Sequence, residues 1–188
     1  HIKKHSDATI VFDAHGATTA MDVKGHRHRK FWVDRDEWLP YIDVLKMNLE
    51  ESQCMSFANE YEHEIPSIYD ENATEHLDDL AKHVLKKGVS YFYVTMDSRG
   101  CILYSMEHDQ LKKDWIASVK VDKVVDTTGC GDSFAGGLAY GFAKYDDPIK
   151  AGQFANILGA RRTQGKNWDV FKTAEETGAN FPSTSIRV

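Results

Sequence analysis

Residues 126–134 of the chain read Asp-Thr-Thr-Gly-Cys-Gly-Asp-Ser-Phe, and this stretch decides the fold. An extended segment runs into it and small and apolar residues follow, so we predict a strand, a glycine-bracketed loop and a helix that begins near Asp132. The glycines let the backbone N–H groups of residues 129–131 point into one concavity, where the helix dipole adds positive potential. The stretch therefore predicts an anion-binding site at a helix N-terminus.

A carboxylate stands at the edge of this predicted anion site. Asp132 would repel a bound phosphate unless it has a chemical task, and the task that fits is to orient an attacking hydroxyl and accept its proton. A plain helix start capped by Asp is the ordinary alternative, but it does not account for the whole stretch. Cys130 beside a helix N-terminus could also be read as a nucleophile, and without a His partner this interpretation is a distant second.

Composition excludes several classes of protein. The chain has 188 residues, of which 41% are hydrophobic, enough to bury a core. Its net charge of −6 disfavours sequence-independent nucleic-acid binding, which needs a basic face. No apolar run approaches the roughly 18 to 20 residues that span a bilayer, and we expect no membrane partner. Three scattered cysteines predict reduced thiols and a cytoplasmic location.

Strand and helix patterns alternate along the chain. The predicted strands are residues 8–13, 43–46, 91–95, 101–105 and 115–125. The predicted helices are residues 34–45, interrupted at Pro40, then 73–87, the helix from Asp132, 148–162 and a short one at 174–177. Residues 21–31 are expected to be a loop or a short exposed hairpin. This alternation predicts an α/β fold with a largely parallel sheet.

The helix from Asp132 is expected to pack closely. Phe134, Leu138 and Phe142 fall on one of its faces. Three glycines are expected to let a neighbouring element approach, namely Gly136, Gly137 and Gly141.

Residues 126–132 resemble the second signature of the PfkB or ribokinase family of carbohydrate and nucleoside kinases, which is roughly D-T-x-G-A-G-D. The resemblance implies that the amides of Gly129, Cys130 and Gly131 stabilise the transferring γ-phosphoryl group and that Asp132 is the catalytic base. Cys130 stands where Ala is usual. Because only its backbone amide is needed, we expect this small side chain to be tolerated.

Residues 46–51, Lys-Met-Asn-Leu-Glu-Glu, resemble the family's N-x-x-E element. The resemblance implies that Asn48 and Glu51 organise Mg2+ and its waters near the phosphates, and one carboxylate with one amide suits that ion. Lys46 either adds positive charge for the phosphates or is a surface residue, and the sequence favours neither.

Residues 95–100 resemble the family's T-x-G-x-x-G turn at the nucleotide, which implies that Thr95, Ser98 and Gly100 contact ATP. Asp97 replaces the first glycine, and a carboxylate near phosphates is unfavourable there. Residues 154–156, Phe-Ala-Asn, match a family helix that lines the adenine pocket, which adds Asn156 to the nucleotide site.

Asp126 and the carbonyl of Thr128 resemble part of the family's monovalent-cation site, which takes K+. The matching later loop is residues 163–167, which are less regular here.

The resemblance implies a ribokinase-like three-layer α/β/α fold, with residues 1–188 as one domain. These residues correspond to the C-terminal, nucleotide-binding part of such a kinase, so we expect the N-terminal strands and the lid to be missing. The implied activity is ATP-dependent phosphorylation of a hydroxyl group on a small sugar or nucleoside, and we expect this chain alone to phosphorylate nothing. A non-catalytic nucleotide-binding fragment or degenerate member that acts as a regulatory partner is the alternative. A homodimer of the full-length protein stays open.

Overall fold

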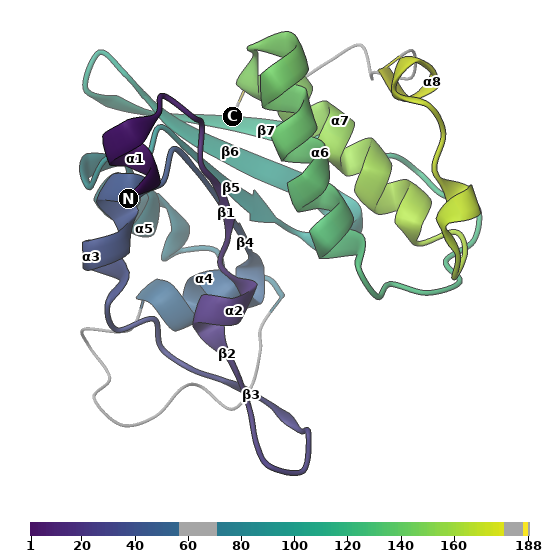
Figure 1. The fold of residues 1–188 in the computed structure, drawn as a ribbon, viewed down its shortest axis with the longest axis horizontal. Helices are drawn as coiled ribbons and strands as arrows, with labels where there is room; N and C mark the ends of the chain where they lie inside the picture. Colours follow the sequence, from purple (N-terminus) through teal and green to yellow (C-terminus); the bar gives the residue numbers. More distant parts are fainter. Residues whose placement is uncertain (57–70, 179–185, 188) are drawn as a thin grey trace. The chain divides into compact units, whose positions relative to one another are not determined.

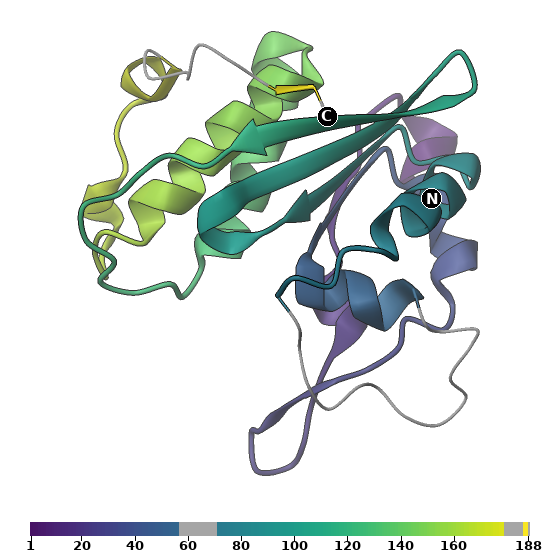
Figure 2. The same cartoon turned by 180° about the vertical axis from the view of Figure 1, so that it is seen from behind.

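The computed structural model describes residues 1–56, 71–178 and 186–187 and contains a six-stranded sheet (Figures 1 and 2). Its strands lie in the order β1 (Val11–Asp13), β4 (Val44–Asn48), β5 (Tyr91–Thr95), β6 (Gly100–Glu107), β7 (Gln110–Ala117) and β8 (Ile186–Arg187). β1 and β4 are parallel, whereas β7 and β8 are antiparallel. The predicted α/β architecture is confirmed, with a mixed sheet.

β6 and β7 form a hairpin through a two-residue turn. His108 and Asp109 both have positive φ, 50° and 62°, as the tight turns that match the twist of two paired strands require. Because β7 begins at this turn and ends at Ala117, the predicted strand over residues 115–125 was wrong in its bounds. Val124 is 57% exposed, and Val125 donates its backbone N–H to Thr163 O at 2.7 Å instead of to a strand.

The chain divides into two compact units. Unit 1 comprises His1–Val94 and Tyr104–Lys112, and unit 2 comprises Thr95–Leu103 and Lys113–Val188. In the described part of unit 1 the helices are α1 (Ile2–His5), α2 (His15–Thr18), α3 (Arg35–Trp38), η1 (Leu39–Tyr41), α4 (Leu49–Ser56) and α5 (Leu77–Lys86). β2 (Thr19–Met21) and β3 (Arg27–Arg29) pair as an antiparallel hairpin, the exposed hairpin expected there.

Two features of unit 1 follow from its sequence. α5 buries its apolar face, which consists of Leu77, Leu80, Ala81, Val84 and Leu85. Gly88, just past its end, has φ +117°, a backbone conformation that favours glycine at a helix C-terminus. The break near Pro40 is also confirmed, because α3 gives way to the short helix η1 there. The predicted helix over residues 34–45 was too long, since η1 ends at Tyr41 and β4 begins at Val44.

The described helices of unit 2 are η3 (Asp97–Arg99), α6 (Cys130–Tyr145), α7 (Pro148–Arg162), η4 (Trp168–Val170) and α8 (Ala174–Gly178). α6 and α7 lie side by side (Figure 1). A Cβ at Gly137 would lie 2.7 Å from Cα of Ala155, and one at Gly141 would lie 2.6 Å from Cα of Ala151. Close packing therefore depends on these two glycines.

Two further expectations for α6 had different outcomes. Gly136 was predicted to allow close packing, but it is exposed and has nothing within 4 Å of its Cβ position. Phe134 and Leu138 are buried, as the helical spacing predicted. Within the part of the chain that the structure describes, no helix has the length and apolar character to cross a membrane.

Candidate functional site

The start of α6 presents backbone N–H groups without acceptors. Gly129 caps the helix with φ +79°, the left-handed conformation that glycine adopts without strain. The amide of Cys130 donates to Thr127 O at 3.2 Å and that of Ser133 to Gly129 O at 2.9 Å. Within the described residues, the first-turn amides of Gly131 and Asp132 have no hydrogen-bond acceptor. Open amides at a helix N-terminus suit an anion.

Asp132 is exposed in the first turn of α6. No hydrogen bond or ion pair joins its side chain to any residue of the described ranges. Its Oδ2 lies 3.7 Å from the position that a Cβ on Gly129 would take, so the carboxylate stands beside the open loop. A carboxylate placed in this way can take a proton from a bound hydroxyl.

Asp126 is held at the entrance to the same loop. Its Oδ1 accepts a hydrogen bond from the amide of Thr128 at 2.9 Å, and this bond, with the charges of Arg162 and Lys166, lowers the pKa of the carboxyl below its ordinary value. The backbone amide of Asp126 donates to Thr163 O at 3.2 Å. The structure therefore places Asp126 beside the start of the loop over residues 163–167.

The 95–100 turn is fixed by backbone geometry. It forms a short helix, η3 (Asp97–Arg99), and Asp97 has φ +51°. This left-handed conformation suits glycine, which stands at this position in the motif that the turn resembles, and Asp tolerates it better than most residues do. Gly100 has φ +105°, and a Cβ there would overlap the carbonyl oxygen of Ile116. Thr95 is half-buried, whereas Ser98 is exposed and accepts a hydrogen bond at its carbonyl from Ser118 Oγ.

Asn156 lies within α7 and is only 8% exposed. Its Nδ2 donates to the carbonyl oxygens of Ile116 and Ala117, both at 3.1 Å. The side-chain nitrogen thus ties α7 to the end of β7. The contact of Asn156 with a nucleotide stays a prediction.

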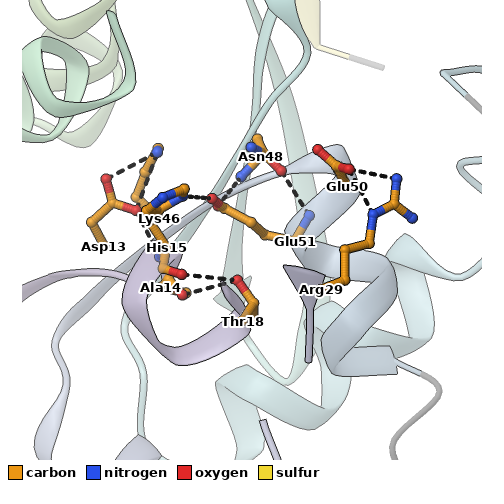
Figure 3. A network of polar contacts seen from close by, with 9 residues as sticks. All are labelled: Asp13, Ala14, His15, Thr18, Arg29, Lys46, Asn48, Glu50 and Glu51. Atoms are coloured by element: carbon orange, nitrogen blue, oxygen red, sulfur yellow. Dashed lines mark hydrogen bonds and ion pairs between the residues drawn. The ribbon is translucent and has the colours of Figure 1, made fainter. Parts of the chain in front are cut away.

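Unit 1 holds a second polar group of residues, shown in Figure 3. Lys46 is 3% exposed, so it is not a surface residue, and its Nζ donates to both carboxylate oxygens of Asp13 at 3.2 and 3.0 Å. Asp13 ends β1 and Lys46 lies opposite it on the parallel neighbour β4. The sequence did not predict this ion pair. The available signal was that two predicted parallel strands, if they are neighbours, bring these two side chains together.

The N-x-x-E element folds into reciprocal caps at the start of α4 (Figure 3). Asn48 Oδ1 accepts from the amide of Glu51 at 2.7 Å, and Glu51 Oε2 accepts from the amide of Asn48 at 2.8 Å. The other carboxylate oxygen, Oε1, lies 2.9 Å from Nδ1 of His15 in α2. The sequence did not predict this contact of His15 with Glu51.

The residues here fit Mg2+ only as an ion that keeps most of its waters. Within the described ranges, no group of three or more His, Cys, Asp and Glu side chains could hold a metal ion. Glu51 is buried and each of its oxygens already has one polar neighbour, so further lone pairs remain for water. Mg2+ is commonly bound through one or two carboxylates, waters and substrate phosphates.

Known proteins are similar to this chain in sequence and in fold. A family model described as pfkB family carbohydrate kinase matches residues 7–169. A ribokinase of Lactococcus lactis is 33% identical over 120 residues, which cover 62% of this chain and 36% of the relative. A 2-dehydro-3-deoxygluconokinase of Bacillus subtilis is 30% identical over 113 residues, covering 58% of this chain and 32% of that protein.

Solved structures show the same fold. The ribokinase of Thermotoga maritima superposes with a TM-score of 0.65 at 21% identity, over 94% of this chain and 50% of that one. The ribokinase of Arabidopsis thaliana gives a TM-score of 0.60 at 22% identity, over 76% and 41%. The chain thus spans about a third of the length of these curated relatives and at most half of these structures. Its fold is ribokinase-like, and the chain belongs to the pfkB family of carbohydrate kinases.

Proposed function

We propose that the chain supplies the nucleotide-binding side of a kinase that transfers a phosphoryl group from ATP to a hydroxyl on a small sugar or nucleoside. The Arabidopsis ribokinase was solved with ribose and ATP, and a nucleoside kinase of Burkholderia thailandensis with inosine. These ligands support the proposed substrate class. The acceptor itself stays undefined, because the chain spans only part of its relatives.

The observation that carries the proposal is the start of α6. Two unpaired amides, those of Gly131 and Asp132, lie next to a carboxylate that no described residue engages. Phosphoryl transfer requires mainly positioning and charge stabilisation, since the chemistry lies in the phosphate itself. Open amides can stabilise the charge on the transferring group, and a free carboxylate can accept the proton of the attacking hydroxyl.

The other predicted residues would serve the same step. Asn48 and Glu51 would hold the waters of Mg2+, which would neutralise phosphate charge when bound. Lys46 lies within β4 and is paired with Asp13, so it would offer its charge to a phosphate only with that carboxylate beside it. Thr95, Ser98, Gly100 and Asn156 would line the nucleotide.

The test is Asp132→Asn in the protein that carries this chain. We expect turnover to fall by roughly 10² or more while MgATP affinity stays nearly unchanged, because the amide side chain cannot accept the proton. Asp146→Asn is the matched control, since Asp146 caps the other end of α6 and Asn tolerates its φ of +48°.

Equal turnover in Asp132→Asn and the wild type would remove Asp132 from the mechanism. A wild-type protein that binds MgATP and transfers nothing to a panel of sugars and nucleosides would instead support a non-catalytic, regulatory member.

A further inference from the structure

We propose that Arg162 supplies, from within the chain, the positive charge that a K+ ion would otherwise supply beside Asp126. This inference deepens the proposed function, because it concerns the loop that would bind the phosphates. The residues that resemble a monovalent-cation site are Asp126, the Thr128 carbonyl and the loop over residues 163–167.

The guanidinium of Arg162 already joins two parts of that site. Its NH2 lies 3.7 Å from Oδ2 of Asp126, and its NH1 donates to Gly165 O at 2.5 Å. Its Nε lies 3.5 Å from the position that a Cβ on Gly129 would take, so the charge stands directly beside the helix cap. The side chain is only 14% exposed. An arginine in this position binds one carbonyl of the loop and places its positive charge beside the Asp126 carboxylate.

The backbone fixes the guanidinium in place. Arg162 is the last residue of α7, where a positive charge interacts favourably with the helix dipole. The carbonyl oxygen of the next residue, Thr163, accepts hydrogen bonds from the backbone amides of Val125 and Asp126, at 2.7 and 3.2 Å. The end of α7 and the segment before Gly129 are therefore held together by backbone hydrogen bonds and by the side chain of Arg162.

The guanidinium makes this place unfavourable for K+. A metal cation beside Asp126 would be repelled by Arg162, whose NH2 already lies 3.7 Å from Oδ2 of that carboxylate. The donor set of this chain therefore does not fit K+, and the fixed guanidinium adds to the positive potential at the start of α6 without exchanging with the salt in solution.

The experiment measures thermal unfolding and MgATP affinity of the 188-residue chain in KCl, NaCl and choline chloride at equal ionic strength. For the wild type we expect the MgATP affinities measured in the three salts to differ by less than about twofold. We expect the Tm to be the same in all three. Arg162→Ala should bind MgATP about tenfold more weakly in choline chloride, the loss expected for a charged hydrogen-bonding group. K+ or low millimolar guanidinium should restore part of that loss.

Arg161→Ala is the matched control. The guanidinium of Arg161 donates to Oγ1 of Thr177 at 2.5 Å, away from Asp126, so this variant should respond to the salts as the wild type does. Arg162→Lys keeps the positive charge on a different side chain. If charge is what the site requires, the MgATP affinity and Tm of this variant should not depend on K+.

A wild-type chain that binds MgATP at least fivefold more tightly in KCl than in choline chloride would overturn the proposal. An Arg162→Ala chain with wild-type affinity and Tm in all three salts would also overturn it. If the wild type binds no MgATP, the proposed function fails, while Tm in the three salts still tests Arg162. If Arg162→Ala does not fold, the wild type and Arg162→Lys give the result by the same criteria.

Discussion

Two helix N-termini in this chain carry family motifs, α4 in unit 1 and α6 in unit 2, and they are completed in different ways. At α4 the side chains of Asn48 and Glu51 cap each other's backbone amides, and His15 engages the remaining carboxylate oxygen. At α6 the cap is Gly129, which has no side chain to satisfy the first turn. The first arrangement positions its own side chains, whereas the second leaves amides open for a ligand.

The largest expected effect is a difference in reactivity among the three cysteine thiols. Burial raises the pKa of Cys54 to about 11 and that of Cys101 to about 12, whereas Cys130 is half-buried at the open helix start. At pH 8 we expect iodoacetamide to modify Cys130 more than about 100-fold faster than Cys101, because the thiolate is the reactive form.

Mass spectrometry of the time course measures the three rates, and saturating MgATP should slow only Cys130. Equal rates at all three thiols, or protection of Cys101 alone, would contradict an open α6 start.

The next effect concerns the buried ion pair of unit 1. Lys46→Met leaves the Asp13 carboxylate partly buried without its cation, so we expect the free energy of unfolding to fall by about 2 kcal/mol. Lys82→Met is the matched control, because Lys82 and Asp79 form an exposed pair worth under about 0.5 kcal/mol. Urea unfolding followed by circular dichroism gives both values. Similar small losses in the two variants would show that the pair does not stabilise the contact between β1 and β4.

A smaller effect separates capping from ion binding at α4. Asn48→Ala removes the acceptor for the Glu51 amide and should cost about 1 kcal/mol of unfolding free energy. Asn48→Asp retains an acceptor oxygen, so we expect its stability to stay near that of the wild type. Urea unfolding compares the two variants with the wild type. If Asn48→Asp is as unstable as Asn48→Ala, the reciprocal caps are not what Asn48 contributes.

The smallest effect is expected at His15. Its side chain is 49% exposed, so His15→Ala should lower the unfolding free energy by less than about 1 kcal/mol. If His15 only orients Glu51, His15→Asn should keep most of the unfolding free energy that His15→Ala loses. Thermal unfolding of both variants measures it, and a loss as large as that of Lys46→Met would show that His15 has a structural role beyond Glu51.

Local patterns predicted the parts of the fold whose causes are local. The strand at Tyr91–Thr95 and the helix at Pro148–Arg162 have the bounds that their residues indicated. The loop before α6 also formed where its glycines predicted, with the left-handed conformation at Gly129.

Distant contacts were not predictable in the same way. Lys46 pairs with Asp13 across 33 residues, and Glu51 meets His15 across 36. No spacing within one segment encodes such pairs, since they depend on which strands become neighbours. The error at β7 has a related cause, because its bounds follow from the turn at residues 108–109 and not from the alternation over residues 115–125.

The most direct measurement is a titration of the 15N-labelled 188-residue chain with MgATP, followed by the chemical shift of each backbone amide. We expect the largest changes at Gly131 and Asp132, because their N–H groups are open to a phosphate, and smaller ones at Asn48 and Glu51, whose amides are already bonded. Amides at the start of α6 that stay unchanged while MgATP binds elsewhere would contradict the assignment of this helix start as the phosphate site.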